Sequence, residues 1–382
     1  MKLKHKKLLN KGIVIGILTF FIILFSLLKL NEDVSEYFFA RGISRAYVYV
    51  ASILSDIFPF SIFEVFAAIC IIALVICLIF IIRLFVKKQR TQSVSLLLKT
   101  IIAILSVALI YVTVASGCYN RKELPLPLYQ GEQLTAEETA ELVKTYLTDF
   151  SAISDRLEYD ETGKSICPYS IDELNELIEK EYERLDCFNG YYSKRTPNVK
   201  TAVISPIMTY FGICGVTFLP VGEAVVNYET PSCYLVVASF HEIAHAKCVM
   251  KERDANLTAY YLLITSENDY LRYCGYMYCL NYLTSTLRIL DYDLYKEIME
   301  YYPTKANKDR ALENDFWASK HTFLDDIGEF FNDLYLKLSG VSDGTANYSD
   351  PSNVYIDKEE ETITIVYSDT AKMLIEHGLN KK

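Results

Sequence analysis

Two histidines separated by three residues are the clearest chemical feature of this sequence. His241 and His245 flank Glu242 in an HExxH motif. If the motif is helical, positions i and i+4 lie on one face, so both imidazoles could bind one zinc ion while Glu242 faces a metal-bound water. The chain holds only five histidines, which makes this spacing improbable by chance. The motif predicts hydrolysis in which Glu242 is the general base and passes the water's proton to a leaving amine.

A catalytic zinc site needs a third protein ligand, and carboxylates that follow the motif are the candidates. They are Glu252, Asp254, Glu267 and Asp269. Glu252 is preferred, although an unbroken helix would place it about 10 Å from His245 along the axis, at ~1.5 Å per residue. Zinc bonds of about 2 Å cannot span that distance. The sequence therefore predicts that the helix ends or turns between Cys248 and Lys251.

Residues around the third ligand are expected to support the metal site. Asn256 lies one turn beyond Glu252 and could hydrogen-bond a ligand, and Asp254 is a second neighbour assigned to that supporting role. A stabilising partner for the oxyanion is also required. The candidates are His321, Tyr348 and Tyr228, and the sequence does not select one of them.

The elements that must position this site fall into two unlike regions. Residues 1–118 contain three apolar runs, at about residues 12–28, 60–86 and 97–116, each long enough to span a bilayer. Residues 31–59 mix charged and aromatic residues, which is typical of a loop with an interfacial helix. The lysine-rich N-terminus and the basic segment between the second and third runs predict a cytoplasmic N-terminus. Three spans then place the remainder of the chain outside the cytoplasm.

The remainder comprises a proline-containing linker, residues 119–134, and one domain, residues 135–382. Periodicity and capping signals predict helices over residues 135–151, 170–185, 232–248, 257–265, 270–290, 308–319, 322–338 and 369–376. Pro231 is expected at the first position of the motif helix, with Thr230 as its cap. Short strands are predicted over residues 199–205, 213–219 and 224–228, and residues from 343 to the last helix are expected to be a loop.

These signals together predict a mainly α fold with a small antiparallel β-sheet. A sheet directly before the motif could hold an extended peptide by strand addition, or could be part of the core only. The tyrosines at 273, 276, 278 and 282 are interpreted as packing residues. Among ten cysteines, Cys167 and Cys187 are the nearest candidates for a disulfide, although buried free thiols are the default.

The sequence argues against two classes of function. The formal net charge is −10 and the soluble part lacks clustered Lys and Arg, which argues against a nucleic-acid partner. The apolar part of the motif helix before His241 is too short to cross a membrane, which argues against an intramembrane protease.

Several stretches together resemble the DUF3810 family, bacterial membrane proteins of unassigned function that are grouped with zinc metallopeptidases. The matching stretches are residues 58–61, 117–121, Ser205 with 210–215, 223–227, 241–245 and 252–256. The resemblance implies a multi-pass protein of the bacterial cell membrane whose zincin-like α+β domain binds zinc and cleaves a protein or peptide substrate. Residues 252–256 are similar to the ExxAD element of membrane-bound HtpX-like and CAAX-processing peptidases, whose Glu binds zinc, which supports Glu252. The family pattern has glycine where this chain has Cys248, and glutamate where it has Asp254.

The alternative hypothesis is a non-catalytic membrane protein with a structural or sensory zinc site. A closed set of four ligands, in which Cys248 joins His241, His245 and Glu252, would favour that alternative.

Overall fold

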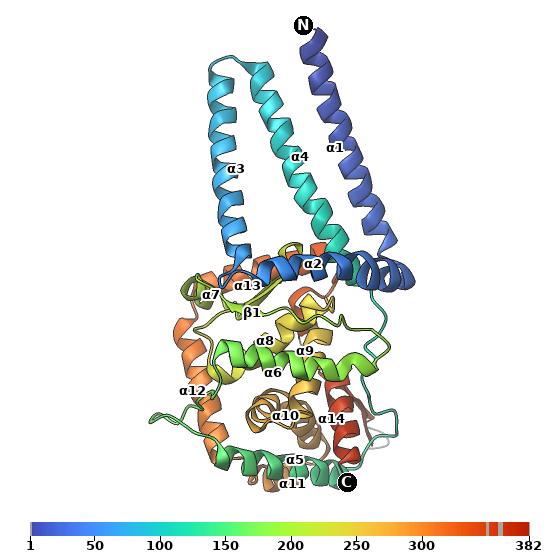
Figure 1. Cartoon of the computed structure of the whole chain (residues 1–382). Coiled ribbons are helices and arrows are strands. Elements are labelled where there is room, and N and C mark those ends of the chain that lie inside the picture. The colour runs from blue at the N-terminus through green and yellow to red at the C-terminus, as the bar shows by residue number, and fades with distance from the viewer. Residues whose placement is uncertain (1, 349–350, 358–361, 382) are drawn as a thin grey trace.

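Three long apolar helices project from one end of a mainly helical domain (Figure 1). The computed structural model describes residues 2–348, 351–357 and 362–381. The projecting helices are α1 (Lys2–Leu28), α3 (Ile62–Val86) and α4 (Arg90–Val114). Each contains a stretch long and apolar enough to cross a membrane, and most of their apolar side chains are not covered by protein. The three predicted spans are therefore confirmed as helices of sufficient length and hydrophobicity.

The segment between the first two long helices, expected to be a loop with an interfacial helix, is helical over most of its length. It forms a π-helix, η1 (Val34–Ser44), that continues into α2 (Arg45–Asp56). Both lie across the end of the domain from which the long helices project (Figure 1). Ser35, Phe39 and Ala40 are fully buried, whereas Tyr49, Val50 and Leu54 are exposed. The segment therefore has one face on the domain and one apolar face away from it.

The linker and the first two helices of the domain agree with the sequence. After a short turn, η2 (Ser116–Cys118), residues 119–134 contain no helix or strand. The helices α5 (Ala136–Arg156) and α6 (Ile171–Glu183) each begin with a capping box, formed by Thr135 with Glu138 and by Ser170 with Glu173. These reciprocal bonds satisfy backbone N–H groups that the first helical turn leaves unpaired. A 3₁₀ turn, η3 (Arg184–Cys187), follows α6.

A three-stranded sheet precedes the motif helix, but it is mixed rather than antiparallel. Its strands are β1 (Val199–Thr201), β2 (Gly215–Phe218) and β3 (Glu223–Val226), in the order β1-β3-β2. β2 pairs antiparallel with β3, whereas β1 pairs parallel with it. The antiparallel prediction was wrong for β1 because α7 (Ser205–Tyr210), β2 and η4 (Leu219–Val221) lie between β1 and β3 and form the long connection that parallel neighbours require.

The remaining helices build the core of the domain. They are α8 (Ser232–Ala246), α9 (Glu252–Ile264), α10 (Asp269–Leu290), α11 (Tyr292–Met299), α12 (Thr304–Lys320), α13 (Phe323–Ser339) and α14 (Asp369–Asn380). α10 packs against α5, α8, α9 and α14 (Figure 1). Its residues Tyr273, Tyr276 and Tyr278 are buried, which confirms the interpretation of the tyrosine run as packing.

Two local predictions were wrong. Pro231 is the N-cap of α8 rather than its first residue, and no side-chain hydrogen bond caps this helix, so Thr230 does not have the expected role. The region expected to be a loop contains η5 (Gly344–Tyr348) and an antiparallel hairpin of β4 (Asn353–Asp357) and β5 (Thr362–Val366). The alternating β-branched residues 362–366 are typical of a strand, so the sequence did contain this signal.

A buried carboxylate joins the domain to the start of α3. Glu223, the first residue of β3, accepts hydrogen bonds from the backbone N–H groups of Ile62 and Phe63, each at 2.8 Å. Lys200 donates to the same carboxylate at 2.7 Å. Burial would raise the pKa of Glu223, but the hydrogen bonds from Lys200 and Ser55 lower it. The domain thus supplies a charged cap at the N-terminus of a long apolar helix, where a negative charge is favourable.

A second buried network joins η1 to the loop after the motif helix. Arg121 donates to Glu36 through Nε at 2.8 Å and Nη2 at 3.1 Å, and through Nη1 to the Cys248 carbonyl oxygen at 3.1 Å. Glu36 is fully buried and Arg121 is 4% exposed. Burial would raise the pKa of Glu36, but the two guanidinium groups of Arg121 and Arg41 lower it. This ion pair connects the membrane end of the domain to the backbone that separates His245 from Glu252.

Candidate metal centre

The motif helix α8 ends at a turn built around a non-glycine residue. Cys248 has φ +68°, in the left-handed region, and Lys247 is the C-cap. The Cys248 N–H donates to the His245 carbonyl at 2.8 Å, and the Val249 N–H donates to the Ala244 carbonyl at 3.0 Å. This pair of bonds is a Schellman motif, which ends a helix by pairing its last carbonyls. The predicted interruption before Glu252 is therefore present, and Cys248 adopts a left-handed conformation that usually favours glycine.

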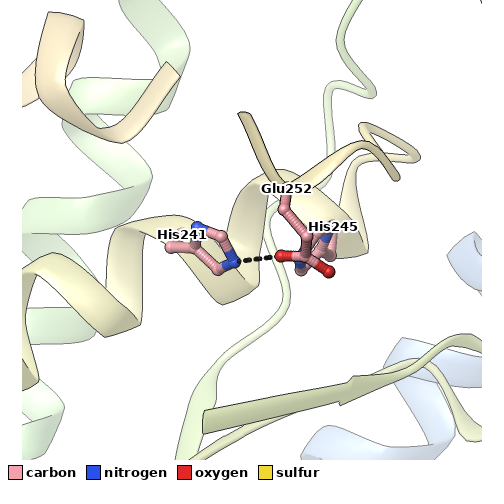
Figure 2. A group of neighbouring side chains, drawn as sticks. All are labelled: His241, His245 and Glu252. Carbon is pink, nitrogen blue, oxygen red and sulfur yellow. Dashed lines mark hydrogen bonds and ion pairs between the residues drawn. The ribbon is translucent and has the colours of Figure 1, made fainter. Parts of the chain in front are cut away.

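The turn brings His241, His245 and Glu252 together. One ligand atom of each residue lies within 4.8 Å of the others, and all three residues are buried. The Nε2 atoms of both histidines lie 3.1 Å from the same carboxylate oxygen, Oε2 of Glu252. Figure 2 shows the carboxylate reaching from the start of α9 back over the end of α8. Among the described residues, this is the only group of histidine, cysteine and acidic side chains that could hold a metal ion.

The second nitrogen of each imidazole already has a hydrogen-bond acceptor. His241 Nδ1 lies 2.8 Å from Oδ1 of Asn256, and His245 Nδ1 lies 2.7 Å from the Val249 carbonyl oxygen. Since an oxygen of this kind only accepts, each Nδ1 carries a proton, and each Nε2 is the ring atom directed to the shared point, where it would bind a metal ion after losing its own proton. This arrangement fits a zinc ion, whose histidine ligands usually donate their other N–H to such a partner. The structure thus places Asn256 within hydrogen-bond distance of the His241 ring.

The charges of the three side chains are strongly coupled. Burial would lower the pKa of His245, but the Glu252 carboxylate outweighs burial and raises it to about 9. Burial would raise the pKa of Glu252, but His245 and His241 hold it well below its usual range. The buried Glu252 carboxylate thus favours a positive charge at this point, either a proton on His245 or a metal cation bound by the two Nε2 atoms.

Glu242 lies between the metal-binding group and strand β2. It is buried, and burial raises its pKa, although His241 and His245 act in the opposite direction. The Thr217 hydroxyl lies 2.7 Å from Oε2 of Glu242. A Cβ added at Gly215 would lie 2.6 Å from Oε1, so this close approach requires glycine. The sequence did not assign functional roles to Gly215 or Thr217, because both lie on a strand distant from the motif in the chain.

The other carboxylates considered as ligands lie outside the metal-binding group. Asp254 lies near Tyr191: burial raises the pKa of that tyrosine, and the charge of Asp254 adds to the rise. Asp269 forms ion pairs with Arg156 and Arg272, and Glu267 is exposed in the turn after α9. Cys248 is buried but does not belong to the group, so the structure does not form the closed set of four ligands.

Of the three candidates for an oxyanion partner, the structure brings Tyr348 to the site. Its ring is nearly parallel to the His241 ring, with 6.5 Å between centroids and 18° between planes. Tyr348 is 39% exposed as a whole, but desolvation of its hydroxyl and the carboxylates of Glu252 and Glu242 raise its pKa, so the hydroxyl stays protonated. His321 instead pairs with Asp325 at 2.6 Å on an exposed surface, and the side chain of Tyr228 is 53% exposed.

Comparison with known families gives one result. A family model described as "Protein of unknown function (DUF3810)" matches residues 39–353, which is most of the chain. The chain belongs to the DUF3810 family. The match begins in η1 and ends at β4, so it includes α3, α4 and the whole metal-binding group. No curated protein and no solved structure matches this DUF3810 chain.

The cysteines of this DUF3810 protein are all free thiols. Cys167 and Cys187, the nearest candidates for a disulfide, are not joined to each other: their sulfur atoms face the carbonyl oxygens of Tyr169 and Arg184. The default expectation of free thiols therefore agrees with the structure.

Proposed function

We propose that this DUF3810 protein is a membrane-anchored zinc metallopeptidase, with a zincin-like domain that hydrolyses peptide bonds of an extracytoplasmic or membrane-proximal protein. One observation carries the proposal: His241, His245 and Glu252 direct their ligand atoms to one point, with Glu242 beside them. Both imidazoles have a partner for Nδ1, which orients Nε2 toward that point.

Zinc held by His241, His245 and Glu252 would supply a Lewis acid that makes water a better nucleophile at neutral pH. Glu242 would accept a proton from the attacking water and deliver it to the leaving nitrogen as the peptide C–N bond breaks. Its raised pKa favours holding that proton between the two steps. Tyr348 would donate its hydroxyl proton in a hydrogen bond to the carbonyl oxygen as negative charge develops there.

Strand β2 offers a place for an extended substrate. β2 is an edge strand, paired with β3 on one side only among the described residues, and α8 packs against it. A peptide that added to the free edge of β2 would lie next to Gly215 and Thr217, both of which contact Glu242. Main-chain hydrogen bonds along such an edge bind a peptide without strong dependence on its sequence.

The setting of the site supports a substrate near the membrane. Cys248 and Met250, which lie between the second histidine and Glu252, share a buried apolar cluster with Val114 and Tyr119 at the end of α4. The N-terminus and the basic turn between α3 and α4 lie at the ends of the long helices remote from the domain (Figure 1). By the positive-inside rule, this arrangement supports a domain outside the cytoplasm.

Hydrolysis of casein or a labelled peptide by the purified full-length protein tests this proposal. Glu242→Gln should abolish hydrolysis while zinc content stays the same, because the amide cannot accept the proton. Glu267→Gln, at an exposed carboxylate outside the site, is the matched control and should hydrolyse at the rate of the unsubstituted protein. Undiminished hydrolysis by Glu242→Gln would refute the mechanism, and zinc binding without any hydrolysis would favour a structural or sensory site.

A further inference from the structure

The outer face of α13 exposes a continuous row of large apolar side chains. Their exposed fractions run from 36% for Ile327 to 78% for Leu338. The row recurs at helical spacing, so its members lie on one side of the helix. It consists of Phe323, Ile327, Phe330, Phe331, Leu334 and Leu338. An exposed apolar surface of this kind marks a contact with another molecule or with a membrane.

The opposite face of α13 is firmly held by the domain, so the orientation of the helix is fixed. Leu336 is fully buried. A Cβ added at Gly328 would lie 2.4 Å from the Phe211 carbonyl oxygen, which shows how closely the helix approaches the loop after α7. The Asn332 side chain donates to the Tyr348 hydroxyl at 3.3 Å. The apolar row is therefore directed away from the domain.

The C-terminal end of α13 is attached where two of the long apolar helices meet the domain. The Ser339 hydroxyl lies 2.6 Å from the Tyr111 hydroxyl, which belongs to the last turn of α4. Lys29, directly after α1, donates to the Ser339 carbonyl oxygen at 2.7 Å. In Figure 1, α13 lies at the same end of the domain as α2, at the level where the long helices leave it. A bilayer crossed by α1 and α4 would have its surface at this level.

We propose that α13 lies in the surface of the bilayer, with its apolar row inserted at the boundary between headgroups and acyl chains. Its position at the ends of α1 and α4 favours lipid over a second copy of the chain as the molecule that covers this row. Its charged residues are mostly acidic and include Asp325, Asp326 and Glu329. Attraction to anionic lipids would therefore not drive the contact, and burial of apolar surface is sufficient for it. The proposal concerns lipid contact and does not depend on zinc or on peptidase activity.

Fluorescence quenching in phosphatidylcholine vesicles tests this contact, because the chain has a single tryptophan, Trp317. In a Trp317→Phe background, Phe331→Trp places the probe in the apolar row. Tyr301→Trp is the matched control: Tyr301 is 43% exposed and follows α11, which lies at the opposite end of the domain (Figure 1). Leu338→Trp, about two turns from Phe331, is a second probe position should the first variant fail to fold.

Reconstituted full-length protein should lose most of its fluorescence in brominated lipid when the probe is at 331 or 338, and almost none when it is at 301. The loss should be the same when anionic lipid is added. Equal fluorescence of all three variants in brominated and ordinary lipid would overturn the proposal. Unquenched probes at 331 and 338 together with a dimer held through this face would assign the row to a second copy of the chain and would also overturn it.

Discussion

Neutralising Glu36 should destabilise the protein strongly, because it would leave the Arg121 charge buried without its partner. Glu36 is fully buried and accepts two hydrogen bonds from Arg121, at 2.8 and 3.1 Å. Removing one member of a buried pair costs about 3–5 kcal/mol. The Arg121 guanidinium also holds the Cys248 carbonyl, so Glu36→Gln should weaken zinc binding as well.

The exposed pair of Asp33 and Lys122 provides a matched control. The Asp33 side chain is 70% exposed and the Lys122 side chain 44% exposed, and Lys122 Nζ lies 2.7 Å from Asp33 Oδ1. Lys122 directly follows Arg121 in the chain. Exposed pairs contribute at most about 1 kcal/mol, so Asp33→Asn should change little. Thermal unfolding of both variants in the same detergent measures the contrast: a loss of about 4 kcal/mol lowers the melting temperature by roughly 10 °C. Equal melting temperatures for the two variants would refute the assignment of Glu36 and Arg121 as a structural link between the membrane end and the metal site.

Three further predictions concern the site and one distant histidine. Gly215→Ala should reduce peptide hydrolysis by about 100-fold with zinc retained, because the new Cβ would displace Glu242. Gly12→Ala is the control and should not change hydrolysis, because a Cβ added there would have no atom within 4 Å. Full activity in Gly215→Ala would contradict this prediction. Asn256→Ala should weaken zinc affinity by about 10–100-fold in a chelator competition, since it removes the acceptor for His241 Nδ1, and unchanged affinity would show that Asn256 does not orient the ligand. Burial and the neighbouring Lys381 lower the pKa of His377 to about 4 from its ordinary value of 6.5. Because the unfolded chain then binds the proton more readily than the folded chain, the free energy of unfolding should fall by about 2 kcal/mol as the pH drops from 6.5 to 4. His377→Gln should remove this loss. A dependence of the unfolding free energy on pH that is unchanged by the substitution would contradict the lowered pKa of His377.

The sequence was sufficient for features that depend on local patterns. The long apolar runs predicted three helices, and the capping residues Thr135 and Ser170 predicted the starts of α5 and α6. The turn before Glu252 followed from distance, because a zinc ion cannot reach this residue along an unbroken helix, and the similarity to the ExxAD element favoured Glu252 over the other carboxylates. The turn that brings Glu252 back is present even though Cys248 replaces the expected glycine.

The sequence was insufficient for features that depend on distant contacts. Arg121 and Glu223 lie in stretches that resemble the family, but nothing in the sequence pairs Arg121 with Glu36 or Glu223 with Lys200, and the fold alone brings these buried charges together. Gly215 is adjacent to Glu242 because β2 packs beside α8, which no local pattern encodes. The parallel pairing of β1 with β3 was missed for the same reason, since strand order depends on the whole connection between them.

X-ray absorption at the zinc edge, measured on purified full-length protein, tests most directly whether His241, His245 and Glu252 form an open zinc site. We predict stoichiometric zinc with only nitrogen and oxygen ligands at about 2.0–2.2 Å, including the outer scattering of two imidazoles. Replacement of Glu252 by Gln should weaken binding and change this first shell. A sulfur neighbour at about 2.3 Å, or a protein that binds no zinc when zinc is supplied, would contradict the proposed site.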